Sequence, residues 1–117
     1  MEKKEPIIVP MIALRGLSIF PGMAISFPAG RQKSLDALQA AEENGKEIFL
    51  VTQKEIQIDD PTQRDLFTIG TVSVVKQVLR LPGDTIRILV EGQYRATMVE
   101  CVQTEPYLYG RVETVND

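Results

Sequence analysis

Most of the chain consists of short apolar stretches separated by turn-forming and polar residues, a pattern typical of β-strands. Two apolar stretches, 7–14 and 23–28, predict strands on either side of a connection that holds the turn-forming pair Pro21-Gly22. A third stretch, 48–51, is apolar at every position, which predicts a central strand covered on both faces. Most of the molecule is therefore expected to be sheet.

One segment, residues 31–44, has a helical pattern instead. Leu35, Leu38 and Ala41 recur at three-residue spacing and form a single apolar stripe. The stripe predicts one helix packed on the sheet. We expect Asn44-Gly45 to end this helix, because glycine adopts the left-handed conformation needed just past a helix end without a steric penalty.

The strongest local signal is a hairpin, 71–81 and 84–91, around Pro82-Gly83. A two-residue loop would place Val75, Leu79, Leu81, Ile86, Ile88 and Val90 on one face, and Lys76, Arg80, Arg87 and Glu91 on the other. A three-residue loop would mix the two faces. In either register Leu89 alternates with Arg87 and Glu91, so it is predicted to point away from the core.

Gly92 is expected to mark a bulge or bend in the second hairpin strand. After it, Tyr94, Ala96 and Met98 continue the inward-facing positions, and residues 107–115 predict a last strand. Together these elements predict a small α+β domain that is mainly β.

Composition narrows the class of protein. A chain of 117 residues with 44% hydrophobic and 25% charged residues fits one globular domain, and its apolar runs are too short to span a bilayer. The charged start, followed by Pro6 and Pro10, lacks the long apolar region of a secretory signal, so a cytoplasmic location is expected. A net charge of −3 and scattered basic residues disfavour nucleic acid as a partner.

The search for catalytic chemistry excludes most hydrolase mechanisms. The chain has no histidine, and its single cysteine, Cys101, is expected to be a small apolar strand residue rather than part of a disulfide or zinc site. Gly45-Lys46-Glu47 lacks the final hydroxyl of a phosphate-binding loop. A Ser-Lys pair stays open on composition, although no spacing nominates one. We interpret Asp59, Asp60 and Asp65 as loop residues rather than as metal ligands.

Six segments of the chain stand out as motifs: Val9-Pro-Met-Ile-Ala-Leu-Arg-Gly16 with Ile19-Phe-Pro-Gly-Met23, Gly30-Arg-Gln-Lys-Ser34, Ile48-Phe-Leu-Val-Thr-Gln53, Asp65-Leu-Phe-Thr-Ile-Gly-Thr71, Lys76-Gln-Val-Leu-Arg-Leu-Pro82, and Leu89-Val-Glu-Gly92 with Arg95. In this order they resemble the amino-terminal domain of bacterial Lon-type ATP-dependent proteases, and the resemblance extends from about Ile8 to Val115. Two departures are the extra Met11 and Ile12 after Pro10, and Pro82-Gly-Asp84 in place of the common Asp-Gly order.

The resemblance implies a PUA-like pseudo-barrel of about six mostly antiparallel strands with one α-helix. It implies a single substrate-recognition domain over residues 1–117, cut at a domain boundary before the helical, ATPase and Ser-Lys peptidase domains of the complete protease. It also implies that this part is not an enzyme, with ATP and Mg bound only in the ATPase domain. The expected partners are unfolded or misfolded proteins and, in the full-length homo-hexamer, the protein's own subunits, with no membrane partner.

The leading functional hypothesis is a module that captures exposed hydrophobic segments of proteins destined for degradation. We nominate five substrate-binding residues: Phe20, Pro21, Met23, Val78 and Leu89. For Phe20 and Met23 a place in the core is an equal alternative, since large apolar side chains are usually buried. Two other functions stay open, an oligomerisation module of the protease ring and, less favoured by the acidic balance, a PUA-like RNA-binding domain.

Leu89→Ser tests the strand alternation directly. An outward Leu89 predicts a change of no more than about 0.5 kcal/mol in the free energy of unfolding, whereas truncating a buried leucine costs about 2 to 5 kcal/mol. Thermal melting measures this change. The variant should also bind unfolded polypeptide more weakly in an NMR titration, and equal shifts in a folded variant would remove Leu89 from the site.

Overall fold

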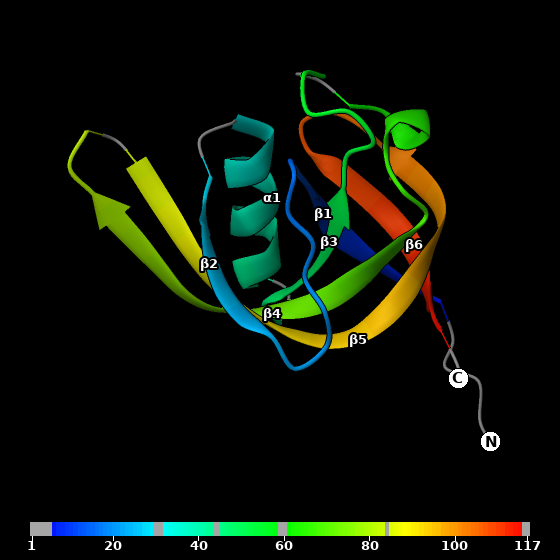
Figure 1. Ribbon diagram of the computed structural model, residues 1–117, viewed down its shortest axis with the longest axis horizontal. Helices are drawn as coiled ribbons and strands as arrows, with labels where there is room; N and C mark the ends of the chain where they lie inside the picture. The colour runs from blue at the N-terminus through cyan, green and yellow to red at the C-terminus, as the bar shows by residue number, and fades with distance from the viewer. Residues whose placement is uncertain (1–5, 30–31, 44, 59–60, 84, 116–117) are drawn as a thin grey trace.

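The computed structural model describes residues 6–29, 32–43, 45–58, 61–83 and 85–115. Its elements are β1 (Ile7–Leu14), β2 (Ala24–Pro28), α1 (Gln32–Glu43), β3 (Glu47–Thr52), the 3-10 turn η1 (Gln63–Asp65), β4 (Ile69–Leu81), β5 (Thr85–Gln103) and β6 (Leu108–Thr114). Figure 1 shows α1 beside a strongly curved sheet, with the tip of the β4–β5 hairpin projecting from the body. The predicted α+β class, mainly β with one α-helix, is confirmed.

The six strands form one sheet in the order β2-β5-β4-β3-β1-β6. Because β5 also pairs with β6, all strands except β2 close into a barrel. Only β1 and β3 run parallel to each other, and the remaining pairs are antiparallel. The predicted pseudo-barrel of mostly antiparallel strands is therefore confirmed.

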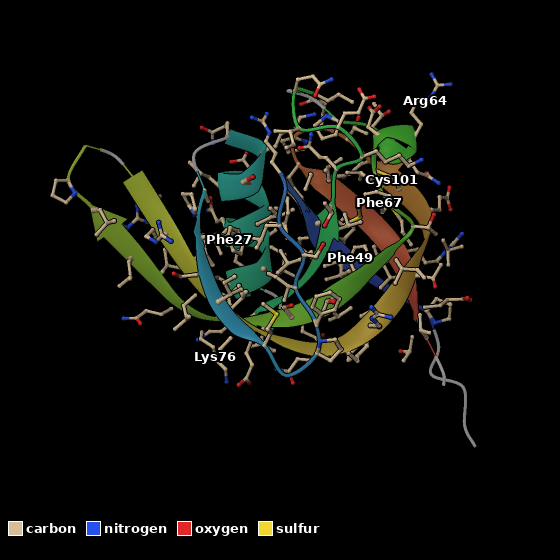
Figure 2. The ribbon with its side chains drawn as sticks, viewed as in Figure 1. Phe27, Phe49, Arg64, Phe67, Lys76 and Cys101 are labelled. Carbon is tan, nitrogen blue, oxygen red and sulfur yellow. The ribbon has the colours of Figure 1, made fainter. Side chains whose placement is uncertain are left out.

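Two hydrophobic clusters lie on opposite faces of β1 and β3, because successive side chains of a strand point to opposite sides. Ile48 and Leu50 face the first cluster, which α1 covers. Phe49 and Val51 face the second cluster, which fills the barrel. Figure 2 shows Phe27, a member of the first cluster, beside α1, and Phe49 among the barrel strands. Every residue of the apolar run in β3 is buried, as its composition predicts.

The helix matches its predicted range and buries the predicted side. Leu38 and Ala41 are buried in the first cluster, and Leu35 packs against it. Gly45 has a φ of 83°, and the Lys46 N–H donates to the Ala41 carbonyl at 2.7 Å, which closes the last turn. Asn44, the other residue of the predicted helix end, lies outside the described residues.

The register of the β4–β5 hairpin corrects part of the sequence analysis. Leu81 pairs with Thr85, so the loop has three residues rather than two. A register shift between Val75 and Gln77 leaves Lys76 as an extra residue in β4. These two features together reverse the faces of the outer part of β4.

As a result, the apolar residues near the hairpin tip divide between the two faces. Leu79 and Leu81 point outward and are 38% and 42% exposed, whereas the two-residue register placed them in the core. Val78, nominated for a surface patch, pairs with Ile88 and packs against the first cluster instead.

Several predictions for the later part of the chain agree with the structure. The register shifts next to Gly92, as predicted, and Ala96 and Met98 beyond it are buried in the barrel. Asp65 accepts a hydrogen bond from the Thr62 N–H at 2.8 Å, so it supports a loop as expected. Asp59 and Asp60 lie outside the described residues. Within the described part of the chain, no helix is long and apolar enough to cross a membrane.

Gly70→Ala tests how closely β3 and β4 approach. A Cβ at position 70 would overlap the Leu50 carbonyl oxygen and lie 2.7 Å from the Phe49 ring. Overpacking of this kind costs typically about 1 to 3 kcal/mol. Urea unfolding of Gly70→Ala should show that loss, while Gln93→Ala, an exposed site on β5, should stay within about 0.5 kcal/mol of wild type. Equal stability of the two variants would contradict the close packing.

Candidate functional site

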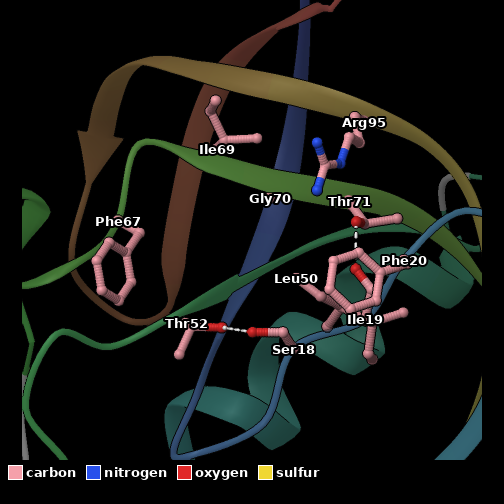
Figure 3. Close-up of a pocket in the computed structure, with 10 residues that line it drawn as sticks. All are labelled: Ser18, Ile19, Phe20, Leu50, Thr52, Phe67, Ile69, Gly70, Thr71 and Arg95. Atoms are coloured by element: carbon pink, nitrogen blue, oxygen red, sulfur yellow. Dashed lines mark hydrogen bonds between the residues drawn. The ribbon is translucent and has the colours of Figure 1, made fainter.

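A pocket of about 220 Å³ opens where the connection from β1 to β2 crosses β3 and β4. It is lined by Ser18, Ile19, Phe20, Leu50, Thr52, Phe67, Ile69, Gly70, Thr71 and Arg95. Three of these are large apolar residues that stay about half exposed: Phe20 at 50%, Phe67 at 50% and Ile69 at 52%. Figure 3 shows Phe67 at one end of this Phe20–Phe67 pocket and Phe20 with Arg95 at the other.

Phe20 owes its position to a tight turn. Pro21 and Gly22 occupy the turn, Gly22 has a φ of 85°, and the Met23 N–H donates to the Phe20 carbonyl at 3.0 Å. Proline followed by a glycine with positive φ favours this geometry. Two backbone hydrogen bonds then join the turn to Gly92. The Gly22 N–H donates to the Gly92 carbonyl at 2.9 Å, and the Gly92 N–H donates to the Met23 carbonyl at 2.8 Å.

Two threonines fix the rest of the connection. The buried Thr71 hydroxyl donates to the Ile19 carbonyl, and the Thr52 hydroxyl donates to the Leu17 carbonyl at 2.8 Å. Ser18 and Thr52 also share a hydrogen bond between their hydroxyls at 3.1 Å, seen in Figure 3. The backbone that carries Phe20 is therefore held in place before any ligand binds.

Phe67 is positioned from the other side of the pocket. Its N–H donates to the Thr52 carbonyl at 3.0 Å, and the preceding residue, Leu66, is 2% exposed and anchors the segment in the barrel. The Phe67 ring itself is 50% exposed.

Arg95 supplies the positive charge of the pocket. Its guanidinium carbon lies 5.6 Å from the centre of the Phe20 ring, which favours a cation–π contact. Lys33, Lys76 and Arg111 each form an ion pair with a glutamate. Among the residues that the structure describes, no carboxylate forms an ion pair with Arg95.

The hydroxyl groups of the pocket and the Cys101 thiol have defined surroundings. The Thr52 hydroxyl donates to the Leu17 carbonyl and shares a hydrogen bond with the Ser18 hydroxyl. Cys101 is a half-buried strand residue, as predicted, and burial raises the pKa of its thiol, so less of the reactive thiolate forms near neutral pH. No group of three or more potential metal ligands occurs in the described part of the chain.

The five nominated substrate-binding residues do not gather in one place. Phe20 lines the pocket, and Pro21 is exposed next to it in the turn. Met23 and Val78 are half-buried and pack against the first core cluster. Leu89 is half-buried and belongs to neither cluster, opposite Ser26 of β2 and Gln77 of β4. Its outward direction agrees with the alternation, and its binding role stays a prediction.

Like Arg95, the large apolar pocket residues Phe67 and Ile69 were not nominated by the sequence analysis. They belong to one of the quoted segments, 65–71, but their exposure was not inferred there. Simple alternation gives no signal here, because Phe67, Ile69 and Thr71 stand at two-residue spacing and Thr71 is buried while Phe67 and Ile69 are half exposed.

Comparison with known sequences identifies relatives over nearly the whole chain. Residues 8–117 match the family described as ATP-dependent protease La (LON) substrate-binding domain. The chain is 44% identical over 109 residues to a Lon protease of Syntrophomonas wolfei, and 41% identical over 114 residues to one of Clostridium acetobutylicum. These matches cover 93% and 97% of the chain, but only 13% and 15% of the two relatives.

Solved structures share the fold. The N-terminal domain of a Mycobacterium avium complex Lon protease superposes with a TM-score of 0.75 at 20% identity, covering 95% of this chain and 56% of that one. A Lon N-terminal domain protein from Xanthomonas campestris gives a TM-score of 0.73 at 14% identity, covering 94% and 60%. At these identities the likeness concerns the fold alone.

Thr71→Val tests whether the pocket depends on the fixed connection. The change keeps the side-chain shape but leaves the buried Ile19 carbonyl without its donor, which should cost about 1 to 3 kcal/mol of unfolding free energy. Amide hydrogen exchange in residues 17–23 should accelerate. Thr97→Val, at a half-buried position of the neighbouring strand β5, is the control. Unchanged exchange in Thr71→Val would contradict the anchoring role.

Proposed function

The chain belongs to the family of ATP-dependent protease La (LON) substrate-binding domains, and from that membership we propose that the Phe20–Phe67 pocket holds exposed apolar segments of protein substrates. The observation that supports this is the gathering of Phe20, Phe67 and Ile69, each about half exposed, around one pocket. Large apolar residues clustered on a surface mark sites of protein interaction.

The small apolar area of the pocket favours weak binding, and its preformed backbone lowers the entropic cost of that binding. Covering apolar surface contributes about 25 cal/mol per Å², and a pocket of about 220 Å³ accepts one or two side chains. Since the turn at Phe20 is already tied to Gly92, little backbone freedom has to be lost when a ligand docks. If several copies stand in one protease ring, individually weak contacts would hold a substrate through their high effective concentration.

Our proposal gives these residues a capture role and no catalytic one. The ATP-dependent Ser-Lys endopeptidase activity, with its ATP and Mg, would belong to other parts of the full-length protein, of which the chain spans 13% to 15% in its relatives. The partners would be unfolded or misfolded proteins, and the setting would be cytoplasmic protein quality control.

A second candidate function, contact between subunits, is favoured by a different feature. The β4–β5 hairpin projects from the body and carries Leu79 and Leu81, 38% and 42% exposed, near its tip. Such a tip could pack on a neighbouring copy in a homo-hexamer. Leu79 and Leu81 do not line the Phe20–Phe67 pocket, so mutations can test the two functions separately.

Ile69→Ser and Ile8→Ser form a matched pair for testing capture. Both isoleucines lie in strands and are 52% exposed, but only Ile69 lines the pocket. Ile69→Ser should weaken binding of a reduced, alkylated, permanently unfolded protein by about three- to tenfold, and Ile8→Ser should leave it unchanged. Heteronuclear NMR titration of the 117-residue chain measures both affinities.

Thermal melting of both variants confirms that they remain folded, since exposed substitutions usually change stability by less than about 0.5 kcal/mol. Sedimentation over a concentration series should run alongside, because self-association would compete with ligand in the titration. Equal affinities of Ile69→Ser, Ile8→Ser and wild type would remove the pocket from the capture site.

A further inference from the structure

Arg95 gives the Phe20–Phe67 pocket a chemical preference that apolar area alone does not supply. Its guanidinium lies over the Phe20 ring, and no carboxylate of the described residues forms an ion pair with it, although the chain carries a net charge of −3. Desolvating an unpaired guanidinium beneath a bound apolar segment would be costly, and an incoming carboxylate offsets that cost.

The strand register sets the distance between the charged and apolar parts of the pocket. Ile69 pairs with Thr97, and Thr71 pairs with Arg95, so Ile69 and Arg95 lie two residues apart along neighbouring strands. Two residues of extended chain span roughly 7 Å. Figure 3 shows the same arrangement, with Phe67 and Ile69 toward one end and Arg95 with Phe20 toward the other.

On the basis of the proposed capture function, we infer that the pocket selects extended segments in which an apolar residue and an Asp or Glu stand two positions apart. In an extended chain, side chains two residues apart point to the same side and lie roughly 7 Å from each other. The apolar side chain then contacts Phe67 and Ile69 while the carboxylate accepts hydrogen bonds from Arg95.

The carboxylate belongs to a side chain rather than to the end of a substrate. A terminal carboxylate continues the line of the backbone, whereas the acidic side chain at the second position projects toward the same surface as the apolar one. The pocket is thus suited to internal segments of unfolded proteins that combine apolar and acidic residues.

Four short peptides test this preference, with binding to the 117-residue chain measured by NMR titration. Three have blocked ends: one has Glu two positions after Phe, one has Gln there, and one has Glu immediately after Phe. The fourth has Gln two positions after Phe and ends in a free terminal carboxylate. The first should bind wild type about three- to fivefold more tightly than each of the others, and about 0.5 M salt should remove the difference.

Arg95→Met is the matched variant, because it keeps an unbranched apolar stem against Phe20 and removes the charge. It should bind the first two peptides equally, while Arg95→Lys should keep part of the preference. Ile69→Ser should weaken all four peptides by a similar factor. This separates the apolar contribution from the charged one.

The contrary outcomes are distinct from one another. Equal affinity of wild type for the Glu and Gln peptides, or an undiminished preference in Arg95→Met, overturns the carboxylate inference and leaves apolar capture standing. Tightest binding of the free-end peptide overturns the assignment to a side chain. Failure of wild type to bind any peptide or an unfolded protein overturns the capture function itself.

Discussion

The close approach of the Phe20 carbonyl to Gly92 is the contact on which both the barrel and the pocket depend. A side chain at position 92 would overlap that carbonyl oxygen and press on the Thr71 methyl group. Gly92 also lies where β5 leaves its pairing with β2 and, beyond the register shift, begins to pair with β6. One small residue thus permits the strand to bend and the connection from β1 to β2 to dock across it.

The same contact explains how an aromatic ring can stay half exposed without being disordered. The backbone of Phe20 is held by the turn and by the hydrogen bonds between the turn and Gly92. Its ring therefore does not need to pack in the core to be positioned, and it stays half exposed. The energy that fixes the ring comes from backbone hydrogen bonds and from the buried Thr71 hydroxyl. A ligand therefore meets an apolar surface whose position is already determined.

Most of the fold could be predicted from the sequence, because alternation in the strands and the stripe of α1 are local patterns. The hairpin faces could not, since the extra residue at Lys76 leaves no local mark and each added residue reverses the faces of all later positions in the strand. The candidate site was only partly predictable. Phe20 and its turn have a sequence signature, but the pocket joins them to Phe67 and Arg95 from distant segments, and only the closed sheet brings these together.

Closure of the barrel has a consequence for synthesis on the ribosome. Val9 and Met11 of β1 are covered in part by β6, whose residues Leu108 and Val112 come far later in the chain. Until then the barrel interior stays open, and long-range strand pairing of this kind is intrinsically slow. A nascent copy of this domain is therefore, for a time, an unfolded chain with exposed apolar segments.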